Sequence, residues 1–362
     1  MSIYGPQKLV HHLPLIKQIG RGIPFTPVHV QLILSDLCNQ SCNFCAYRME
    51  GYTSNQLFGI GAGEERNNNP NRMIPADKVQ EILRDCSLLG VQAIQFTGGG
   101  EPTVHPAHVE AISECLKLGM QAALVSNGVL WSERLRDVLL GAAWVRVSVD
   151  AANARTYSRI RGVSEGHFSR AIGNLRELCL LKRLRGSQVA IGVGFVVTKD
   201  NWQEVCEAAK LAKETGADNF RISGIFQNEG AKYFAEFYEA ASDLCQQAQE
   251  LSGDGFMVFN NFTDRVADQE HRPDYERCGY QHLTTYIGGD QNVYRCCNTS
   301  YNERGLLGSI KDRSFREFWL SDETHAKLCD FDARGCDRCQ FNGQNHFINY
   351  ALQAATPHVA FT

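Results

Sequence analysis

The sequence predicts an α/β fold in which parallel strands are connected by helices. Residues 28–34 form an uncharged, largely apolar run of strand length, as a buried strand requires. From residue 76 to residue 251, segments with apolar residues at helical spacing alternate with short apolar runs rich in β-branched residues. A strand followed by a crossover helix favours a parallel neighbour. After residue 262 this alternation gives way to short strands, turns and cysteines, which predicts a second, smaller unit.

The elements of the larger unit follow one another in a regular order. Gly90 ends the first predicted helix, as a left-handed helix end favours. The fifth strand has little charge and contains Gly192 and Gly194, which fits a strand buried on both faces. The predicted strands are 28–34, 91–96, 121–125, 144–149, 189–197 and 219–223, and the predicted helices are 76–89, 107–118, 132–140, 168–183, 201–215 and 232–251.

Composition places the chain among globular proteins. Hydrophobic residues make up 43% of it, enough for a sizeable core, and the net charge of -4 gives no general signal for nucleic acid or membrane. No apolar stretch approaches the length of about 18 residues that a membrane helix needs, and the first thirty residues lack a secretory pattern. We therefore expect a cytoplasmic protein. Fourteen cysteines in a reducing compartment favour metal sites over disulfides.

Three cysteines leave the carboxyl end of the first strand on one loop, where α/β proteins place their chemistry. They are Cys38, Cys42 and Cys45. A closed zinc site wants four ligands, and neither a fourth cysteine nor a histidine follows within the next thirty residues. Thiolate sets otherwise serve iron-sulfur clusters. Three thiolates on a four-iron cluster leave one iron open to a substrate or cofactor.

A glycine-rich turn, 97–102, follows the second strand. Three glycines let backbone groups approach a ligand closely, and Glu101 supplies an acceptor for an ammonium group. The same composition also suits a plain tight turn.

The two motifs together, with aromatic Phe44 just before the third cysteine, resemble the radical S-adenosylmethionine (radical SAM) enzymes. The resemblance implies a partial (β/α)6 TIM-like barrel and a 4Fe-4S cluster whose open iron chelates S-adenosyl-L-methionine (SAM). It also implies reductive cleavage of SAM to a 5'-deoxyadenosyl radical that takes hydrogen from a substrate C–H bond, and a reducing partner such as flavodoxin or ferredoxin.

The resemblance also assigns cofactor-binding residues. The amino group of SAM is expected at Gly99, Gly100 and Glu101, and its carboxylate at Arg161. The methionine or ribose part is expected at Ser126, Ser148 and Asp150, which end consecutive strands. Residues 126–128 also have the composition of an ordinary turn, and Asp150 is equally suited to cap the next helix. At the end of the sixth strand, Arg221 and Ser223 are further candidates, with a structural salt bridge as the alternative for Arg221.

A second cysteine group lies near the carboxyl end. Cys278, Cys296, Cys336 and Cys339 make a complete four-thiolate set, which structural zinc prefers. The arrangement resembles the auxiliary-cluster modules called SPASM and Twitch, with 314–319 as the helix between a hairpin, 286–296, and the turn 336–339. It implies a second 4Fe-4S cluster, and because no cysteine follows Cys339 the short Twitch form fits.

Two departures from the module pattern stand out. Gln291 occupies the hairpin turn where the family usually has glycine, so the sequence does not determine the backbone conformation of this turn. Cys297 adjoins Cys296, so either thiol can be the ligand. We expect the unbound thiol, Cys297 in our assignment, to be catalytic by donating a hydrogen atom to a substrate radical, as a cysteine does in relatives that invert a stereocentre. A buried thiol without a chemical role is the alternative.

The chain is divided accordingly into an amino-terminal extension (1–27), a radical SAM barrel (28–255), a Twitch-type module (256–345) and a tail (346–362). Residues 48–73, rich in Gly and Asn, predict a lid over the substrate. The basic stretch 155–185 is interpreted as either a solvated helix face or a phosphate-binding patch.

The expected reaction is an isomerisation, rearrangement or oxidation of a modified nucleoside, sugar or similar small molecule, including thymidine hypermodification in phage DNA. A base in duplex DNA would have to leave the stack to react. A peptide-modifying SPASM/Twitch maturase is the first alternative, although residues 1–27 are too short for the usual leader-recognition domain. A non-catalytic, metal-containing nucleic-acid-binding protein is the second.

Overall fold

The computed structural model describes residues 5–47, 72–226 and 228–353. Their strands form one ten-stranded sheet in the order β10-β9-β8-β1-β2-β3-β4-β5-β6-β7. The strands from β8 to β7 in this order are all parallel, and β9 and β10 add antiparallel pairs at one edge. The strands are β1 His29–Leu32, β2 Ala93–Phe96, β3 Gln121–Ser126, β4 Trp144–Ser148, β5 Ala190–Val197, β6 Asn219–Gly224, β7 Met257–Asn261, β8 Thr284–Ile287, β9 Asn292–Tyr294 and β10 Leu306–Ser309.

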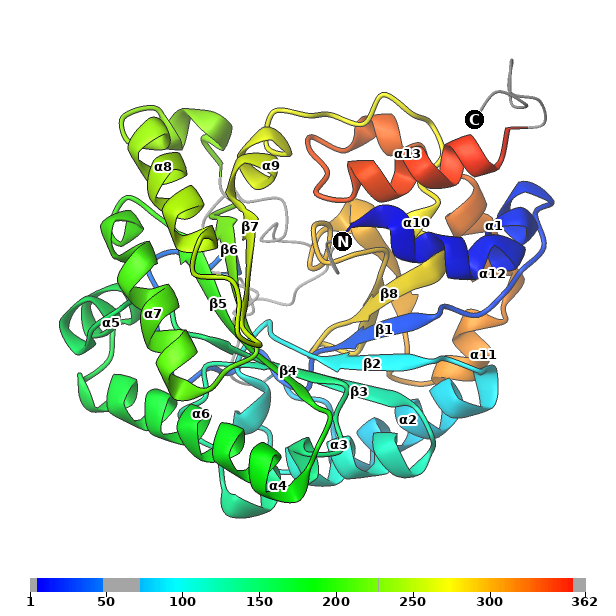
Figure 1. Ribbon diagram of the computed structural model, residues 1–362. Helices are drawn as coiled ribbons and strands as arrows, with labels where there is room; N and C mark the ends of the chain where they lie inside the picture. Colours follow the sequence, from blue (N-terminus) through cyan, green and yellow to red (C-terminus); the bar gives the residue numbers. More distant parts are fainter. Residues whose placement is uncertain (1–4, 48–71, 227, 354–362) are drawn as a thin grey trace, which may run out of the picture.

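The sheet curves into an open barrel with helices around its outer face (Figure 1). The predicted partial barrel is confirmed. Its helices are α2 Ala76–Leu89, α3 His108–Lys117, α4 Glu133–Leu139, α5 Ala154–Arg161, α6 Gly166–Arg185, α7 Val205–Thr215 and α8 Tyr238–Gln249. Beyond the barrel lie α1 Leu13–Gly20, α9 Phe262–Ala267, α10 Tyr280–Leu283, α11 Phe315–Trp319, α12 Asp322–Cys329 and α13 Asn342–Ala351, with short 3-10 helices at Pro6–His12, Pro102–Val104, Trp202–Glu204, Gly230–Phe234, Glu303–Gly305 and Ala333–Gly335.

The core lies between the sheet and the outer helices. Leu32, Phe96 and Leu124 are aligned across β1, β2 and β3 and are all buried. Gly90 ends α2 in the left-handed conformation with φ +80°, as its sequence predicts. Burial of the apolar side chains throughout this core is the main favourable contribution to folding.

Two features of the sheet and one helix were not predicted from the sequence. Met257–Asn261 is a seventh parallel strand beside β6, and Ala154–Arg161 is a short helix. The strand Thr284–Ile287 of the predicted module pairs in parallel with β1, so the hairpin that precedes Cys296 extends the barrel sheet. The domain boundaries stay a prediction.

The amino-terminal segment packs at the amino end of β8. Leu9, Ile16 and Ile19 are buried against Leu283, which directly precedes β8, and against Ile348 of α13. The described part of the chain contains no helix long and apolar enough to cross a membrane. The cytoplasmic location stays a prediction, and the proposed lid lies outside the described residues except for Arg72 and Met73.

Four of the eight Lys and Arg side chains in the basic stretch 155–185 form ion pairs with aspartates. Arg161 is buried beside Asp150, while Arg159, Lys182 and Arg185 form ion pairs with Asp200, Asp218 and Asp137. These contacts favour the interpretation as a solvated helix face.

Candidate active site

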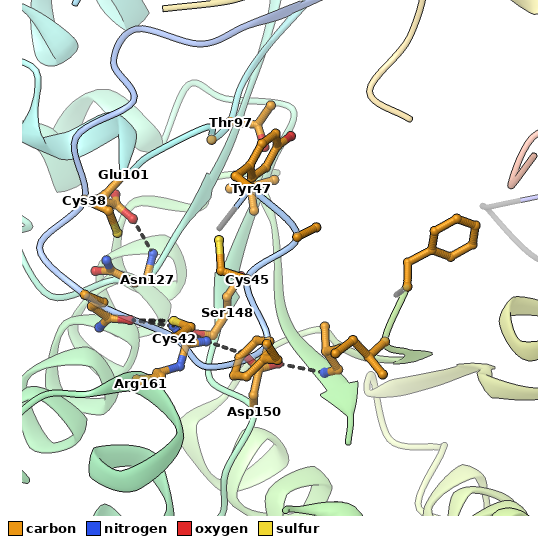
Figure 2. A pocket seen from close by; sticks show the side chains of 18 of the residues that line it. Cys38, Cys42, Cys45, Tyr47, Thr97, Glu101, Asn127, Ser148, Asp150 and Arg161 are labelled. Atoms are coloured by element: carbon orange, nitrogen blue, oxygen red, sulfur yellow. Dashed lines mark hydrogen bonds and ion pairs between the residues drawn. The ribbon is translucent and has the colours of Figure 1, made fainter. Parts of the chain in front are cut away.

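A cavity of about 400 Å³ opens at the carboxyl ends of the barrel strands. It brings together the three-cysteine loop after β1, the glycine turn after β2 and the polar ends of β3, β4 and β6 (Figure 2). The predicted residues that line it are Cys38, Cys42, Cys45, Gly99, Gly100, Glu101, Ser126, Ser148, Asp150, Arg161, Arg221 and Ser223.

The cysteine loop is fixed by backbone contacts. Ser41 and Asn43 donate backbone hydrogen bonds to the carbonyls of Arg161 and Ile160, each at 2.9 Å. Gly162 ends α5 with φ +60°, and a Cβ there would lie 3.0 Å from the Ser41 carbonyl oxygen. The end of α5 therefore packs closely against the cysteine loop, and a side chain at position 162 would push the two apart.

The three thiols have the chemistry of a metal-binding set. None of the three forms a disulfide, and all are partly accessible. Burial raises the pKa of the Cys38 thiol to about 12, and the charges of Glu101, Cys42 and Cys45 add to the rise. Three neighbouring thiolates are thus unfavourable unless a bound cation compensates them, and a bound metal deprotonates thiols outright.

The donor sets of both cysteine groups fit iron-sulfur clusters, which cysteine thiolates hold. Cys38, Cys42 and Cys45 line the cavity described above, and Cys278, Cys296, Cys336 and Cys339 line a second, smaller one. A closed four-cysteine set also suits structural zinc.

Glu101 is held by the strand ends beside it. One carboxylate oxygen accepts hydrogen bonds from Thr103 Oγ1 and Ser126 Oγ, both at 2.7 Å, and the other accepts one from the backbone N–H of Asn127 at 2.8 Å (Figure 2). Since a carboxylate oxygen accepts two or more hydrogen bonds, Oε2 keeps capacity for an ammonium group. Ser126 also accepts from Trp131 Nε1 at 3.0 Å, so its role is to orient Glu101.

The glycines of the turn allow a close approach to the cysteine loop. A Cβ on Gly100 would collide with the backbone of Asp36 and Leu37, and one on Gly99 with the Asp36 carboxyl. Gly100 N–H donates to the Ser35 carbonyl at 3.0 Å, joining the two loops.

Arg161 and Asp150 form a buried ion pair beneath the cysteine loop (Figure 2). Arg161 also donates to Gln40 Oε1 at 2.6 Å and to the carbonyl oxygens of Ser148 at 2.7 Å and Val149 at 3.2 Å. Burial would lower the pKa of Arg161, but the charge of and hydrogen bond to Asp150, together with the charges of Cys42 and Tyr157, outweigh burial and the net shift of the pKa is upward.

The guanidinium is therefore fully engaged, and its predicted contact with the SAM carboxylate requires one of these bonds to be exchanged. The alternative role of Asp150 as a helix cap is wrong, because Asn153 caps α5 through Thr156 N–H. Asp150 has φ +59°, and its Oδ1 accepts from Val196 N–H at 2.7 Å.

The second cysteine group surrounds a small cavity of about 30 Å³. Cys278, Cys296, Cys336 and Cys339 all line it, together with aromatic residues, and Cys297 does not. Burial and the charge of Cys296 raise the pKa of Cys339 to about 12. The placement favours Cys296 as the fourth ligand. Gln291, in the hairpin turn, adopts the left-handed conformation with φ +62° that glycine usually supplies.

Cys297 lies behind the wall of the main cavity. Its sulfur accepts a hydrogen bond from Gln340 Nε2 at 3.2 Å, and it packs in the same cluster as Tyr47. Gln340 and Tyr47 both line the main cavity. The sequence analysis missed Gln40, Tyr47 and Gln340; only Gln40 carried a signal, since it stands between two of the predicted ligands.

The Radical SAM superfamily model matches residues 32–212, half of the chain. The chain belongs to the radical SAM superfamily. This family uses a 4Fe-4S cluster and SAM, and its SPASM/Twitch-type members carry auxiliary clusters. The predicted radical SAM enzyme with a SPASM/Twitch-type module is confirmed.

Similar proteins of this family differ in what their names state. The AdoMet-dependent heme synthase of Methanosarcina barkeri is 22% identical over 329 residues, covering 84% of this chain and 86% of that protein. The GTP 3',8-cyclase of Clostridium acetobutylicum is 24% identical over 241 residues, covering 66% of this chain and 67% of that protein. Streptococcus suis SuiB bound to the precursor peptide SuiA matches with a TM-score of 0.60 at 15% identity, covering 91% of this chain and 73% of SuiB. The family therefore does not fix the substrate.

Proposed function

We propose that Cys38, Cys42 and Cys45 hold the catalytic 4Fe-4S cluster and that the cavity beside them binds SAM. When bound, the cluster and SAM supply a 5'-deoxyadenosyl radical that abstracts a hydrogen atom from a substrate C–H bond. One observation carries the proposal: the three thiols and the Gly98–Glu101 turn line one cavity at the carboxyl ends of neighbouring parallel strands. This is the end of an α/β barrel at which active sites lie.

The chain's own residues orient the cofactor and exclude water. The spare capacity of Glu101 Oε2 suits the amino group of SAM, and the side chain of Ser148 lies on the same wall. Phe44, Tyr47 and Ile225 give the cavity an apolar part. A water-poor wall protects a reactive intermediate from side reactions.

We extend the proposal to the second site, with Cys278, Cys296, Cys336 and Cys339 as ligands of an auxiliary 4Fe-4S cluster. The four cysteines would hold a centre that supplies an electron acceptor for the substrate radical, and the outcome would then be an oxidation. Hydrogen-atom donation from the Cys297 thiol would instead give an isomerisation or epimerisation and leave a thiyl radical, which one electron from the reducing partner and one proton return to the thiol. This donation requires the Gln340 side chain that bonds the Cys297 sulfur to move aside. A flavodoxin or ferredoxin is the proposed reducing partner.

The proposed substrate is a nucleoside, a sugar or a similar small molecule, with a modified thymidine in DNA among the candidates. The cavity volume lies near the lower end of the usual range of about 300–1,000 Å³ for ligand sites, and SAM occupies part of it. The space that the described residues leave beside the cofactor favours a small reacting group. The name of the GTP cyclase relative supports the nucleotide class.

Peptide modification is the second candidate, supported by the fold shared with SuiB, which was solved with a precursor peptide. The test is 5'-deoxyadenosine formation by anaerobically reconstituted protein with SAM and dithionite, first alone and then with nucleosides, sugars or peptides. Substrate-stimulated formation with nucleosides or sugars is expected. Stimulation by peptides alone would replace the substrate proposal, and no formation under any condition would overturn the proposed function.

A further inference from the structure

Asp36 and Tyr301 join the cysteine loop to the carboxyl-terminal module. Asp36 lies two residues before Cys38, and Tyr301 lies five residues after Cys296. Both side chains are buried, and the Tyr301 hydroxyl donates a hydrogen bond to Asp36 Oδ1. One hydrogen bond therefore joins the segment just before Cys38 to the segment just after Cys296.

The Asp36 carboxyl is packed between glycines of two different loops. A Cβ on Gly99, in the proposed SAM-binding turn, would collide with Asp36 Oδ1 and lie 3.0 Å from the Tyr301 hydroxyl. A Cβ on Gly289, in the turn between β8 and β9, would lie 3.0 Å from the same Asp36 oxygen. Gly289 N–H also donates to the Tyr301 hydroxyl at 3.1 Å. The carboxyl and the hydroxyl thus fill the space between these backbones.

Tyr301 keeps an uncommon backbone conformation in this place. Its φ is +54°, in the left-handed region that side chains other than Gly, Asn and Asp rarely adopt. Such a conformation costs free energy and persists where surrounding contacts hold it, which is frequent at functional sites. The segment back to Cys296 is short and bonded to itself, with Ser300 Oγ donating to the Cys297 carbonyl at 2.9 Å. A change at Cys296 is therefore transmitted to Tyr301 through few bonds.

We infer that Tyr301 is a positioning residue that sets the affinity for SAM by holding the Gly99 turn through Asp36, and that it couples this turn to the auxiliary site. The inference rests on the proposed function, since it takes the Gly98–Glu101 turn as the SAM site. Because coupling between two sites is reciprocal, SAM binding and the state of the auxiliary site influence each other to the same extent.

The first test is the variant Tyr301→Phe, which removes the hydroxyl and keeps the ring. Its matched control is Tyr294→Phe, whose buried ring packs 5.4 Å from that of Tyr301 and whose hydroxyl donates to Asp290 within the hairpin. Binding of SAM to reconstituted protein is measured by equilibrium dialysis, with iron and sulfide content determined in parallel. Loss of this buried hydrogen bond, which leaves the Asp36 oxygen without the Tyr301 donor, predicts about tenfold weaker SAM binding for Tyr301→Phe at unchanged iron content, with a raised KM for SAM and a largely retained kcat.

The coupling is tested by a double-mutant cycle with Cys336→Ser, which removes an auxiliary ligand. We expect Cys336→Ser to weaken SAM binding in the wild-type background and to have little further effect in the Tyr301→Phe background. Additive effects would overturn the coupling, and a Tyr301→Phe dissociation constant within twofold of the control would overturn the positioning role. If Tyr301→Phe does not fold, Asp36→Leu replaces it, because leucine has no acceptor for the Tyr301 hydroxyl; weaker SAM binding is again expected, and an unchanged dissociation constant would again contradict the inference.

SAM binding by the wild-type protein distinguishes a failure of the proposed function from a failure of this inference. Failure of the wild type to bind SAM would overturn the proposed function and this inference together. Binding by the wild type with no effect of Tyr301→Phe would overturn the inference alone.

Discussion

The two cysteine groups differ in ligand number and in surroundings. Three thiols of the first group lie on one loop beside an open cavity of about 400 Å³, whereas four thiols of the second group enclose a cavity of about 30 Å³ lined by aromatic residues. Three ligands and free space leave room for a cofactor to bind the metal centre. Four protein ligands around a small cavity leave little room for a cofactor, which favours electron transfer or a structural role. The same residue type thus supports two different chemistries through coordination number and access.

The largest effect is expected at the open site. Cys42→Ser should abolish 5'-deoxyadenosine formation, because two remaining thiolates cannot hold a four-iron cluster with one open iron. The readout is chromatographic detection of 5'-deoxyadenosine after anaerobic incubation with SAM and dithionite. Cys206→Ser is the matched control, since Cys206 is a partly buried thiol on α7 whose Sγ contacts the Leu244 carbonyl. Equal 5'-deoxyadenosine formation by the Cys42 variant and the control would contradict the assignment of the open site as the one that cleaves SAM.

At the enclosed site, the fourth ligand can be identified by comparing neighbours. Cys296→Ser should lose about four irons per chain relative to wild type, whereas Cys297→Ser should keep them. The reason is that Cys296 lines the small cavity and Cys297 does not. Iron and sulfide analysis of reconstituted protein measures both. The reverse pattern would make Cys297 the ligand.

Cys336→Ser should remove the enclosed centre and leave part of the SAM cleavage. The open site keeps all three of its thiols in this variant, so cleavage uncoupled from substrate turnover is expected to persist. Parallel assays of iron content and 5'-deoxyadenosine test it. Complete loss of cleavage with the first cluster intact would mean that the two sites are not separable in this way.

A smaller effect is expected from the ion pair that supports the open site. Asp150→Asn leaves the buried Arg161 without its charge partner, and breaking such a pair typically costs about 3–5 kcal/mol of folding free energy. Thermal unfolding should show a lower Tm. The control Asp137→Asn removes a partner of Arg185 on the surface, where ion pairs contribute about 0–1 kcal/mol. Equal Tm values for both variants would contradict the structural role of the buried pair.

The sequence predicted the strands that carry the site because their residues have short-range signals. The apolar run at 28–34, the glycine turn after β2 and the polar residues at the strand ends are local patterns, and the turn and the strand-end residues line one cavity. β8 beside β1 was not predictable, because that pairing joins segments about 250 residues apart in the sequence through backbone contacts that any residues can make.

The partners of the site residues were equally hidden in the sequence. The engagement of Arg161 with Asp150, Gln40 and two backbone carbonyls depends on the path of the loop after β4, and no spacing rule encodes it. The contact between Asp36 and Tyr301 joins residues 265 positions apart. Long-range side-chain contacts of this kind follow from the fold and not from a local pattern.

The most direct test of the account is the metal content of the anaerobically reconstituted wild-type protein, combined with electron paramagnetic resonance of the reduced protein before and after addition of SAM. The account predicts about eight irons per chain and a spectrum that changes when SAM binds the open iron. Tightly held zinc, or a reduced cluster whose spectrum SAM leaves unchanged, would contradict the assignment of Cys38, Cys42 and Cys45 as the catalytic cluster site.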